Sequence, residues 1–234
     1  MKPVRSAKSQ RTRQNLLSAA LRVIGREGYT AATVDQIVRE AGVSKGVAYY
    51  HFKSKEEIGA SILAEKTDQI HDRLAVCAEE GRAPDETLHL MLTTFTELAF
   101  HDLVFTRFLM NELWREGRIW SDDLRRKMGL ISTLIAEQIE RGQRSGLFRP
   151  QLDARFLATG MIGLVITNAM RVADPEAEHP MSEDAFCAQV ALLFRQALLT
   201  ENRASEGACP PCQAAGSPDR PAHAGATAPA MPHQ

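Results

Sequence analysis

Apolar residues recur at helical spacing through every long segment of the chain, and this pattern constrains the fold more than any other feature. In residues 9–27 the positions on one helix face are Leu16, Leu17, Ala20, Val23 and Ile24. Glycine and proline stand between such segments, and the sequence has no β-branched run of period two. We therefore expect an all-α protein.

Capping residues and glycines divide the chain into helices. Thr33–Gln36 and Ser54–Glu57 both fit a capping box, in which two side chains satisfy the free N–H groups of a helix start. Gly28 and Gly42 follow apolar segments as left-handed stops. The helices that we predict cover residues 9–27, 33–41, 44–51, 54–79, 85–101, 103–116, 121–144, 153–173 and 182–200.

The composition is that of an ordinary globular chain. Its 234 residues are 44% apolar and 24% charged, with a formal net charge of −1. The longest apolar run, residues 162–166, is far shorter than a membrane span, and the N-terminus lacks the apolar stretch of a secretory signal. The 4 cysteines are too few for a disulfide framework. We expect a cytoplasmic protein with reduced thiols and no membrane partner.

The small net charge hides an asymmetry along the chain. Residues 1–60 hold 11 basic and 5 acidic side chains, whereas residues 61–234 hold 17 and 24. A basic end on an acidic body indicates that this end meets a polyanion. The alternative is a solvated basic arm made of Lys2, Arg5, Lys8, Arg11 and Arg13.

Residues 33–52 carry the pattern of a helix-turn-helix, two short helices joined by a tight turn. Ala41 is small where the helices would cross, Gly42 supplies the positive φ of the turn, and Ser44 opens the second helix. In this motif the second helix lies in the major groove, where its N-terminal residues meet base edges. The segment therefore predicts binding to double-stranded DNA.

The start of the second helix supplies the expected DNA contacts. Lys45 can donate to a guanine edge or a phosphate, Gly46 permits close approach, and Val47 can touch a thymine methyl. The alternative is that the lysines are solvated and that the tyrosines, like Phe52, belong to the core. The residues that we expect to contact DNA are Thr33, Ser44, Lys45, Gly46, Val47, Tyr49, Tyr50, His51 and Lys55.

Residues 11–58 closely resemble the DNA-binding region of the tetracycline-repressor (TetR) family of bacterial transcription regulators. The matching stretches are Thr12-Arg13, Ala19-Ala20, Gly28-Tyr29, Thr33-Val34-Asp35-Gln36-Ile37, Ala41-Gly42-Val43-Ser44-Lys45-Gly46, Tyr49-Tyr50-His51-Phe52 and Lys55-Glu56-Glu57. Ala48 departs from the family, which often has a larger apolar residue there. The resemblance implies a three-helix DNA-binding domain, a longer connecting helix, and a helical C-terminal domain for ligand binding and dimerisation.

We accordingly place a helix-turn-helix domain at residues 9–54, a connector helix at 55–80 and a ligand-binding and dimerisation domain at 81–203. Residues 204–234 hold 9 alanines, 6 prolines and 3 glycines without Ile, Leu, Val or an aromatic residue. Such a tail cannot bury enough apolar surface to offset its ordering entropy, so we expect it to be disordered.

The C-terminal helices contain many large apolar residues, most of which we expect in the core. Some of them can line an apolar cavity with a few polar anchors, as small-molecule sites do. The resemblance implies an effector pocket in this region without assigning any single residue. Our candidates are Phe95, His101, Phe105, Phe108, Asn111, Glu112, Trp114 and Asn168.

A helix-turn-helix that reads a palindrome needs two-fold symmetry, which favours a homodimer. The segments 153–173 and 182–200 have wide apolar stripes, and Gly160 and Gly163 allow close helix approach. The family pairs its last two helices across the dimer, and these segments are in the corresponding place. Packing within one chain is the alternative.

We therefore expect a dimeric repressor that a small apolar or amphipathic effector releases from operator DNA. Two alternatives remain open: an architectural protein indifferent to sequence, and a thiol or metal sensor acting through Cys209 and Cys212. The sequence contains none of the glycine-rich loops, nucleophile elbows or metal-binding signatures of common enzymes. We expect no catalytic activity, no metal and no cofactor.

Overall fold

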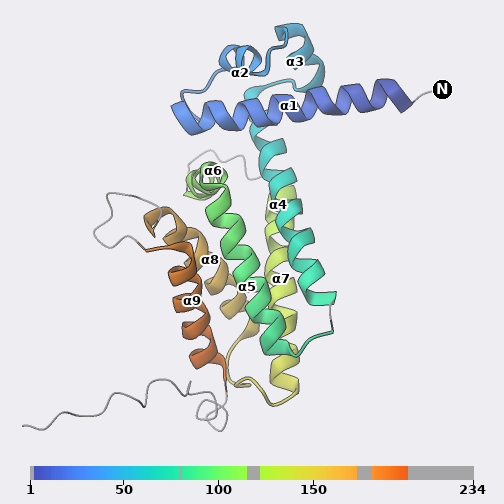
Figure 1. Cartoon of the computed structure of the whole chain (residues 1–234). Helices are drawn as coiled ribbons and strands as arrows, with labels where there is room; N and C mark the ends of the chain where they lie inside the picture. Colours follow the sequence, from blue (N-terminus) through green and yellow to red (C-terminus); the bar gives the residue numbers. More distant parts are fainter. Residues whose placement is uncertain (1–2, 80, 115–121, 173–180, 200–234) are drawn as a thin grey trace, which may run out of the picture. The chain divides into compact units, whose positions relative to one another are not determined.

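The computed structural model describes residues 3–79, 81–114, 122–172 and 181–199, and the side chains of residues 7–79, 81–112, 122–171 and 181–199. The regular elements within these ranges are all α-helices, as the periodicity predicts (Figure 1). They are α1 (Pro3–Glu27), α2 (Val34–Ala41), α3 (Lys45–His51), α4 (Lys55–Glu79), α5 (Pro84–His101), α6 (Leu103–Trp114), α7 (Asp122–Arg144), α8 (Ala154–Val172) and α9 (Glu183–Leu198).

The start of α1 differs from the prediction. The helix begins at Pro3 rather than near Ser9, whereas the other helices agree with the predicted ranges to within two residues. Proline is well tolerated at the first helical position because its missing N–H would have no partner there. Residues 3–8 have no apolar face, so periodicity could not reveal this extension.

The first three helices, which we call the headpiece, close around a small apolar core. The capping box at the start of α2 is confirmed, because the Gln36 N–H donates to Thr33 Oγ1 at 3.2 Å and the Thr33 N–H donates to Gln36 Oε1 at 2.8 Å. The buried side chains that join the helices are Leu16, Ala20 and Val23 of α1, Ile37 of α2 and Ala48 of α3.

Helices α4 to α9, which we call the body, pack on one another around a second part of the core. α4 packs against α5 and α7, and α5 also contacts α8 and α9. The side chains at the centre of the body are almost fully buried, among them Leu74, Met91, Ile131, Ile139, Met161 and Val165. α4 belongs to the body along most of its length and also contacts α1 (Figure 1).

The connection between α7 and α8 is fixed by a close contact. A Cβ atom on Gly142 would lie 2.0 Å from the Phe148 ring, so only glycine admits this ring. The Arg149 N–H donates to the Leu198 carbonyl at 2.9 Å, and the Arg149 Nε donates to the Leu199 carbonyl at 2.8 Å. This connection therefore also holds the end of α9.

Among the helices that the structure describes, none combines the length and apolar character needed to cross a bilayer. The predicted tail, residues 204–234 with Cys209 and Cys212, lies outside the described residues. Within the described part, no cluster of three His, Cys, Asp or Glu side chains could hold a metal ion.

Candidate functional site

The turn between α2 and α3 has the geometry of a helix-turn-helix. Gly42 has a left-handed backbone with φ of 66°, and its N–H donates to the Arg39 carbonyl at 3.2 Å. The next N–H, of Val43, donates to the Val38 carbonyl at 3.1 Å, which completes the end of α2. Ser44 then caps α3, because its Oγ accepts the Val47 N–H at 3.3 Å.

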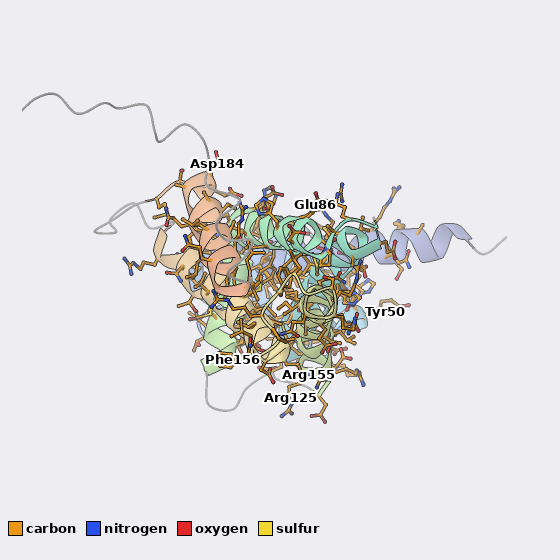
Figure 2. The ribbon with its side chains drawn as sticks, turned by 90° about the horizontal axis from the view of Figure 1, so that it is seen from below. Tyr50, Glu86, Arg125, Arg155, Phe156 and Asp184 are labelled. Atoms are coloured by element: carbon orange, nitrogen blue, oxygen red, sulfur yellow. The ribbon has the colours of Figure 1, made fainter. Side chains whose placement is uncertain are left out.

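One face of α3 is buried and the other is exposed. Ala48 and the following Phe52 are 1% and 3% exposed, so both belong to the headpiece core. Val47, Tyr49 and Tyr50 are 37%, 47% and 80% exposed, and Tyr50 lies at the outer edge of the molecule in Figure 2. The alternative that the two tyrosines are core residues is therefore wrong, whereas Phe52 is a core residue as expected.

Lys45, the first residue of α3, is paired with an acid of α2. Its Nζ lies 2.7 Å from Asp35 Oδ1, and both side chains are more than half exposed. The hydrogen bond with Asp35 and its charge raise the pKa of the Lys45 ammonium above its ordinary value. Gly46 beside it is exposed, and a Cβ there would meet no atom within 4 Å. The start of α3 is thus exposed, with open space beside Gly46.

The Lys55 side chain, which we expect to contact DNA, instead contacts the protein's own backbone. Its ammonium donates to the carbonyls of Tyr29, Thr30 and Ala32 at 3.0–3.1 Å. It also lies 4.9 Å from the centre of the Tyr29 ring. These contacts hold the loop between α1 and α2 on the start of α4, so the ammonium is used within the protein.

The second capping box is only partly as predicted. The Glu57 N–H donates to Ser54 Oγ at 3.2 Å, but the Glu57 carboxylate accepts from the Lys53 N–H at 2.6 Å instead of the Ser54 N–H.

Two further residues that we expect to contact DNA are Thr33 and His51. Thr33 is exposed at the start of α2, and the half-buried His51 ring stands edge-on to Tyr50, with centroids 5.1 Å apart.

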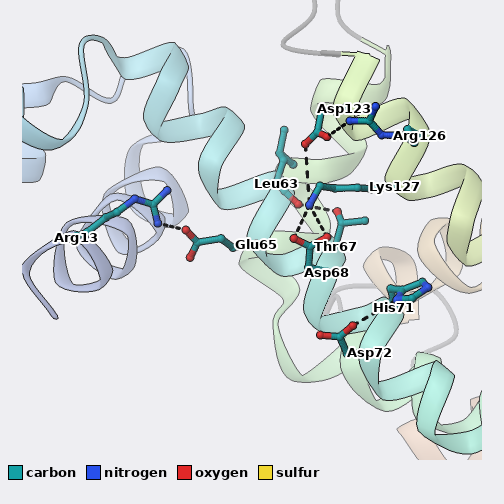
Figure 3. A network of polar contacts seen from close by, with 10 residues as sticks. All are labelled: Arg13, Leu63, Glu65, Thr67, Asp68, His71, Asp72, Asp123, Arg126 and Lys127. Atoms are coloured by element: carbon teal, nitrogen blue, oxygen red, sulfur yellow. Dashed lines mark hydrogen bonds and ion pairs between the residues drawn. The ribbon is translucent and has the colours of Figure 1, made fainter. Parts of the chain in front are cut away.

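Ion pairs fix α1 against its neighbours. Arg22 and Arg26 each donate to the Glu40 carboxylate of α2 at 2.8 Å, and these hydrogen bonds hold the pKa of Glu40 below its ordinary value. Arg13 pairs with Glu65 of α4 (Figure 3). Three of the basic side chains of α1 are therefore used internally.

One turn of α4 is tied by charge to several elements. Glu65 pairs with Arg13 of α1, and Asp68 pairs with Lys127 of α7 (Figure 3). Between them, Lys66 pairs with Asp102 at 2.7 Å. A cleft of about 270 Å³ lies beside this turn, between α1, α4 and the start of α6. The sequence alone does not indicate this cleft, because its lining mixes polar and apolar side chains from three separate segments.

The body contains an apolar cavity of about 20 Å³ between five helices. Its lining residues are Ile70 of α4; Phe95, Leu98 and Ala99 of α5; Phe105, Thr106 and Leu109 of α6; Met128 and Ile131 of α7; and Ile162 and Ile166 of α8. The Thr106 hydroxyl donates to the Ala99 carbonyl at 2.9 Å, so its proton is already used. Of the predicted pocket residues, Phe95 and Phe105 lie in this lining.

The other predicted pocket residues lie elsewhere. Phe108 is buried against Tyr29, with ring centroids 5.1 Å apart. His101 and Asn111 are exposed, whereas Glu112 is buried on α6. The two residues not yet placed are Asn168, whose amide donates to the Leu164 carbonyl of its own helix at 2.9 Å, and Trp114, whose side chain lies outside the described residues.

Comparison with known proteins agrees with this geometry. The profile of the family described as "Bacterial regulatory proteins, tetR family" matches residues 16–62. The repressor NicS of Pseudomonas putida is 28% identical over 151 residues, which cover 64% of this chain and 71% of NicS. The fatty acid metabolism regulator protein of Bacillus subtilis is 28% identical over 154 residues, 64% of this chain and 77% of that protein.

Solved structures share the fold. FadR of Bacillus subtilis in complex with stearoyl-CoA has a TM-score of 0.69 and 22% identity, covering 79% of this chain and 98% of FadR. The ketosteroid regulator KstR2 of Mycobacterium tuberculosis has a TM-score of 0.66 and 22% identity, covering 81% and 95%.

α3 is an exposed helix that follows a capped turn, and the chain also has a helical body. These features, with the comparisons, define a DNA-binding transcriptional regulator of the helix-turn-helix class. Residues 16–62 match the TetR family of bacterial regulatory proteins, and relatives over most of the chain are themselves transcriptional regulators.

Proposed function

We propose that this regulator is a homodimeric repressor, and that a small molecule with a long apolar part releases it from a palindromic operator. The observation that carries this proposal is the course of α6. Its Phe105 and Leu109 line the apolar cavity, while its Phe108 lies against Tyr29 of the headpiece. A ligand that opens the cavity must therefore act on a helix that contacts the DNA-binding part.

The DNA side of the proposal rests on α3. Its exposed residues Val47, Tyr49 and Tyr50 continue the open surface around Lys45 and Gly46. In helix-turn-helix proteins such a face lies in the major groove, and phosphate contacts from nearby groups position it. Lys8 and Arg11 of α1 are exposed and have no partner within the described residues, so they are available for phosphate.

The proposed dimer rests on exposed apolar side chains and open glycines of the last two helices. Phe156 of α8 is 76% exposed, and Leu192 and Leu193 of α9 are 49% and 51% exposed. Gly160 and Gly163 are exposed, with no atom within 4 Å of an added Cβ. A second copy can approach such a face closely, which supports an isologous interface.

This dimer can be tested without disturbing the protomer. Gly163→Arg adds bulk and charge where the protomer leaves open space, so the fold should persist while the dimer dissociates. Light scattering should report a monomer, and affinity for a palindromic duplex should fall because one headpiece binds alone. Gly129→Arg on α7, also in open space, is the matched control. A dimer that survives Gly163→Arg would place the interface elsewhere.

The effector class rests on the chemistry of the cavity. The lining is apolar except for Thr106, whose hydroxyl is already bonded, so the cavity suits a hydrocarbon chain or ring system. Relatives named for fatty acid metabolism, and the FadR structure with stearoyl-CoA, support a fatty acyl effector. The volume of about 20 Å³ is near that of one water, so the cavity must widen to bind such a chain.

Widening of the cavity would be the conformational change that lowers DNA affinity. A ligand shifts a conformational equilibrium only when it prefers one of the two states. Here it would prefer a state with α6 and α4 displaced, in which Phe108 no longer supports Tyr29 in the same position. A coupling of about 1–3 kcal/mol, or roughly 5–150-fold in affinity, is usual for allosteric proteins.

The test is binding of labelled operator in the presence of acyl-CoA of increasing chain length. We expect long-chain thioesters, stearoyl-CoA among them, to weaken operator binding, and operator to weaken thioester binding by the same factor. Ile131→Trp fills the cavity wall and should abolish the response while leaving DNA binding in place. Thioester binding that is equal with and without operator would refute the switch.

A further inference from the structure

We propose that the cleft between α1, α4 and the start of α6 is a ligand site separate from the apolar cavity of the body, and that it takes a small carboxylate carrying one apolar ring. Its volume is about 270 Å³, against about 20 Å³ for the apolar cavity. A cavity of about 150 Å³ can hold a benzene molecule, so the cleft has room for a ring and a polar substituent without widening. Among the described residues, the two linings share no member.

The deep part of the cleft is apolar. Leu17 of α1 and Ile62 of α4 lie in its lining and are only 5% and 3% exposed. Val104 at the start of α6 also lies in the lining but is 38% exposed, so a large apolar side chain meets water beside the headpiece. The hydrophobic effect favours the covering of such a surface. An apolar ring of the ligand would therefore lie against these three side chains.

The carboxylates of the lining already have hydrogen-bond partners at both oxygens. Glu65 accepts from two side chains of α1, one at each oxygen. Asp102 accepts the Phe105 N–H at 3.0 Å with one oxygen, and its other oxygen pairs with Lys66 at 2.7 Å. A cationic ligand would have to compete with these partners, so the acids of the cleft do not favour one.

The cations of the lining, in contrast, keep unused donors. Lys66 of α4 pairs with Asp102 alone among the described residues, and an ammonium can donate to further acceptors. Arg22 of α1 donates from Nε to Glu40 at 2.8 Å, and its terminal N–H groups have no acceptor in the described part of the chain. Because charge-assisted hydrogen bonds to a carboxylate are strong, the donors on these two walls favour an anionic ligand.

A ligand in the cleft would also affect the switch, and this part of the inference rests on the proposed function. Val104 lines the cleft, and the next residue, Phe105, lines the apolar cavity. A displacement of α6 that widens the apolar cavity therefore changes the shape of the cleft. An acid that fits the cleft while the apolar cavity is closed prefers the closed state. It would thus oppose an acyl-CoA, and the acyl-CoA would oppose the acid by the same factor.

The first experiment is titration calorimetry of the full-length protein, without DNA, against benzoate, benzamide and acetate. Benzamide keeps the ring without the charge, whereas acetate keeps the charge without the ring. We expect benzoate to bind roughly tenfold more tightly than either, because it alone uses both the apolar part and the donors of the cleft. No binding of benzoate, or equal affinity for the three compounds, would overturn the site.

Variants determine whether benzoate binds in the cleft. Lys66→Gln should weaken benzoate binding roughly tenfold, whereas Lys66→Arg should retain it. Lys53→Gln, at an exposed lysine outside the lining, is the matched control and should change nothing. Ser18→Trp fills the cleft from an exposed position of α1 and should abolish binding, with a thermal melt to verify each fold. Unchanged benzoate affinity in Lys66→Gln and Ser18→Trp would place the site elsewhere and contradict the proposal.

The second experiment measures the release of labelled operator by stearoyl-CoA with and without saturating benzoate. We expect benzoate to raise the stearoyl-CoA concentration needed for half release by roughly fivefold or more, and to have no such effect in Ser18→Trp. An unchanged release curve in a protein that binds benzoate would overturn the coupling. If stearoyl-CoA never releases the operator, the proposed function is wrong, whereas benzoate binding still decides whether the cleft is a site.

Discussion

The Tyr29 ring of the loop between α1 and α2 stacks on the Phe108 ring of α6, with centroids 5.1 Å apart and planes inclined by 31°. The contact joins the headpiece to the body through α6, beside the start of α4, where Lys55 also contacts Tyr29. Val104 of α6 lies beside Gly25 of α1 in the same region, 3.0 Å from where a Cβ would be. α4, the predicted connector, is therefore not the single connection between the headpiece and the body within the described residues.

Replacing either ring should loosen this junction. We expect Tyr29→Leu and Phe108→Leu each to lower the free energy of unfolding, and the double variant to reveal an interaction energy of about 0.5–1.5 kcal/mol. Denaturant unfolding of the four proteins in the cycle measures it. Strictly additive effects would mean that the two rings do not support one another.

Lys55 should affect DNA binding only through the fold. Lys55→Met keeps the aliphatic stem but removes the donor to three loop carbonyls, so we expect the unfolding free energy to fall by about 1–3 kcal/mol. The salt slope of DNA binding should not change, because no phosphate contact is lost. If the slope of log affinity against log salt became shallower by about 0.9 while stability stayed the same, Lys55 would be a phosphate contact after all.

Helix positions could be predicted from sequence because local signals agree with the tertiary fold. Thr33, Gly42 and Ser44 have the capping and turn roles that their residue types indicate, since these depend on near neighbours in the chain. The exception, the start of α1, lies where polar residues leave no periodic pattern.

Contacts between distant segments could not be predicted in the same way. The place of Lys55 at a helix start indicates a DNA contact, and the apolar density around Phe108 indicates a pocket, yet each residue contacts the loop around Tyr29. Periodicity shows that a residue such as Phe108 is buried but not which helix covers it. The ring of Tyr29, next to the stop at Gly28, was part of the family resemblance without any sign of its partner.

We expect Gly46 to matter for DNA affinity and not for the stability of the protein. Ala at this exposed position of α3 meets no atom within 4 Å and favours the helix, so Gly46→Ala should keep or slightly raise stability. If the backbone approaches the bases here, DNA affinity should fall by about 1–3 kcal/mol, the size of a base contact. Titration of labelled operator measures this fall, and unchanged affinity would exclude close approach at Gly46.

We expect a substitution at Gly142 to lower the stability of the protein. An added methyl would overlap the buried Phe148 ring, and overpacking of this kind costs about 1–3 kcal/mol. Gly129→Ala on the same helix has open space and serves as the control, with stability kept or raised. Thermal unfolding of the two variants checks the difference, and equal melting temperatures would contradict the packing described for α7 and α8.

The central claim is that this chain reads a specific DNA sequence as a symmetric pair. Repeated selection of bound duplexes from a random pool by the full-length protein tests it most directly. The account predicts enrichment of an inverted repeat, with half-site centres about 34–36 Å apart or a multiple of this spacing. A bound pool without an enriched sequence, or a single half-site without its inverted copy, would contradict it.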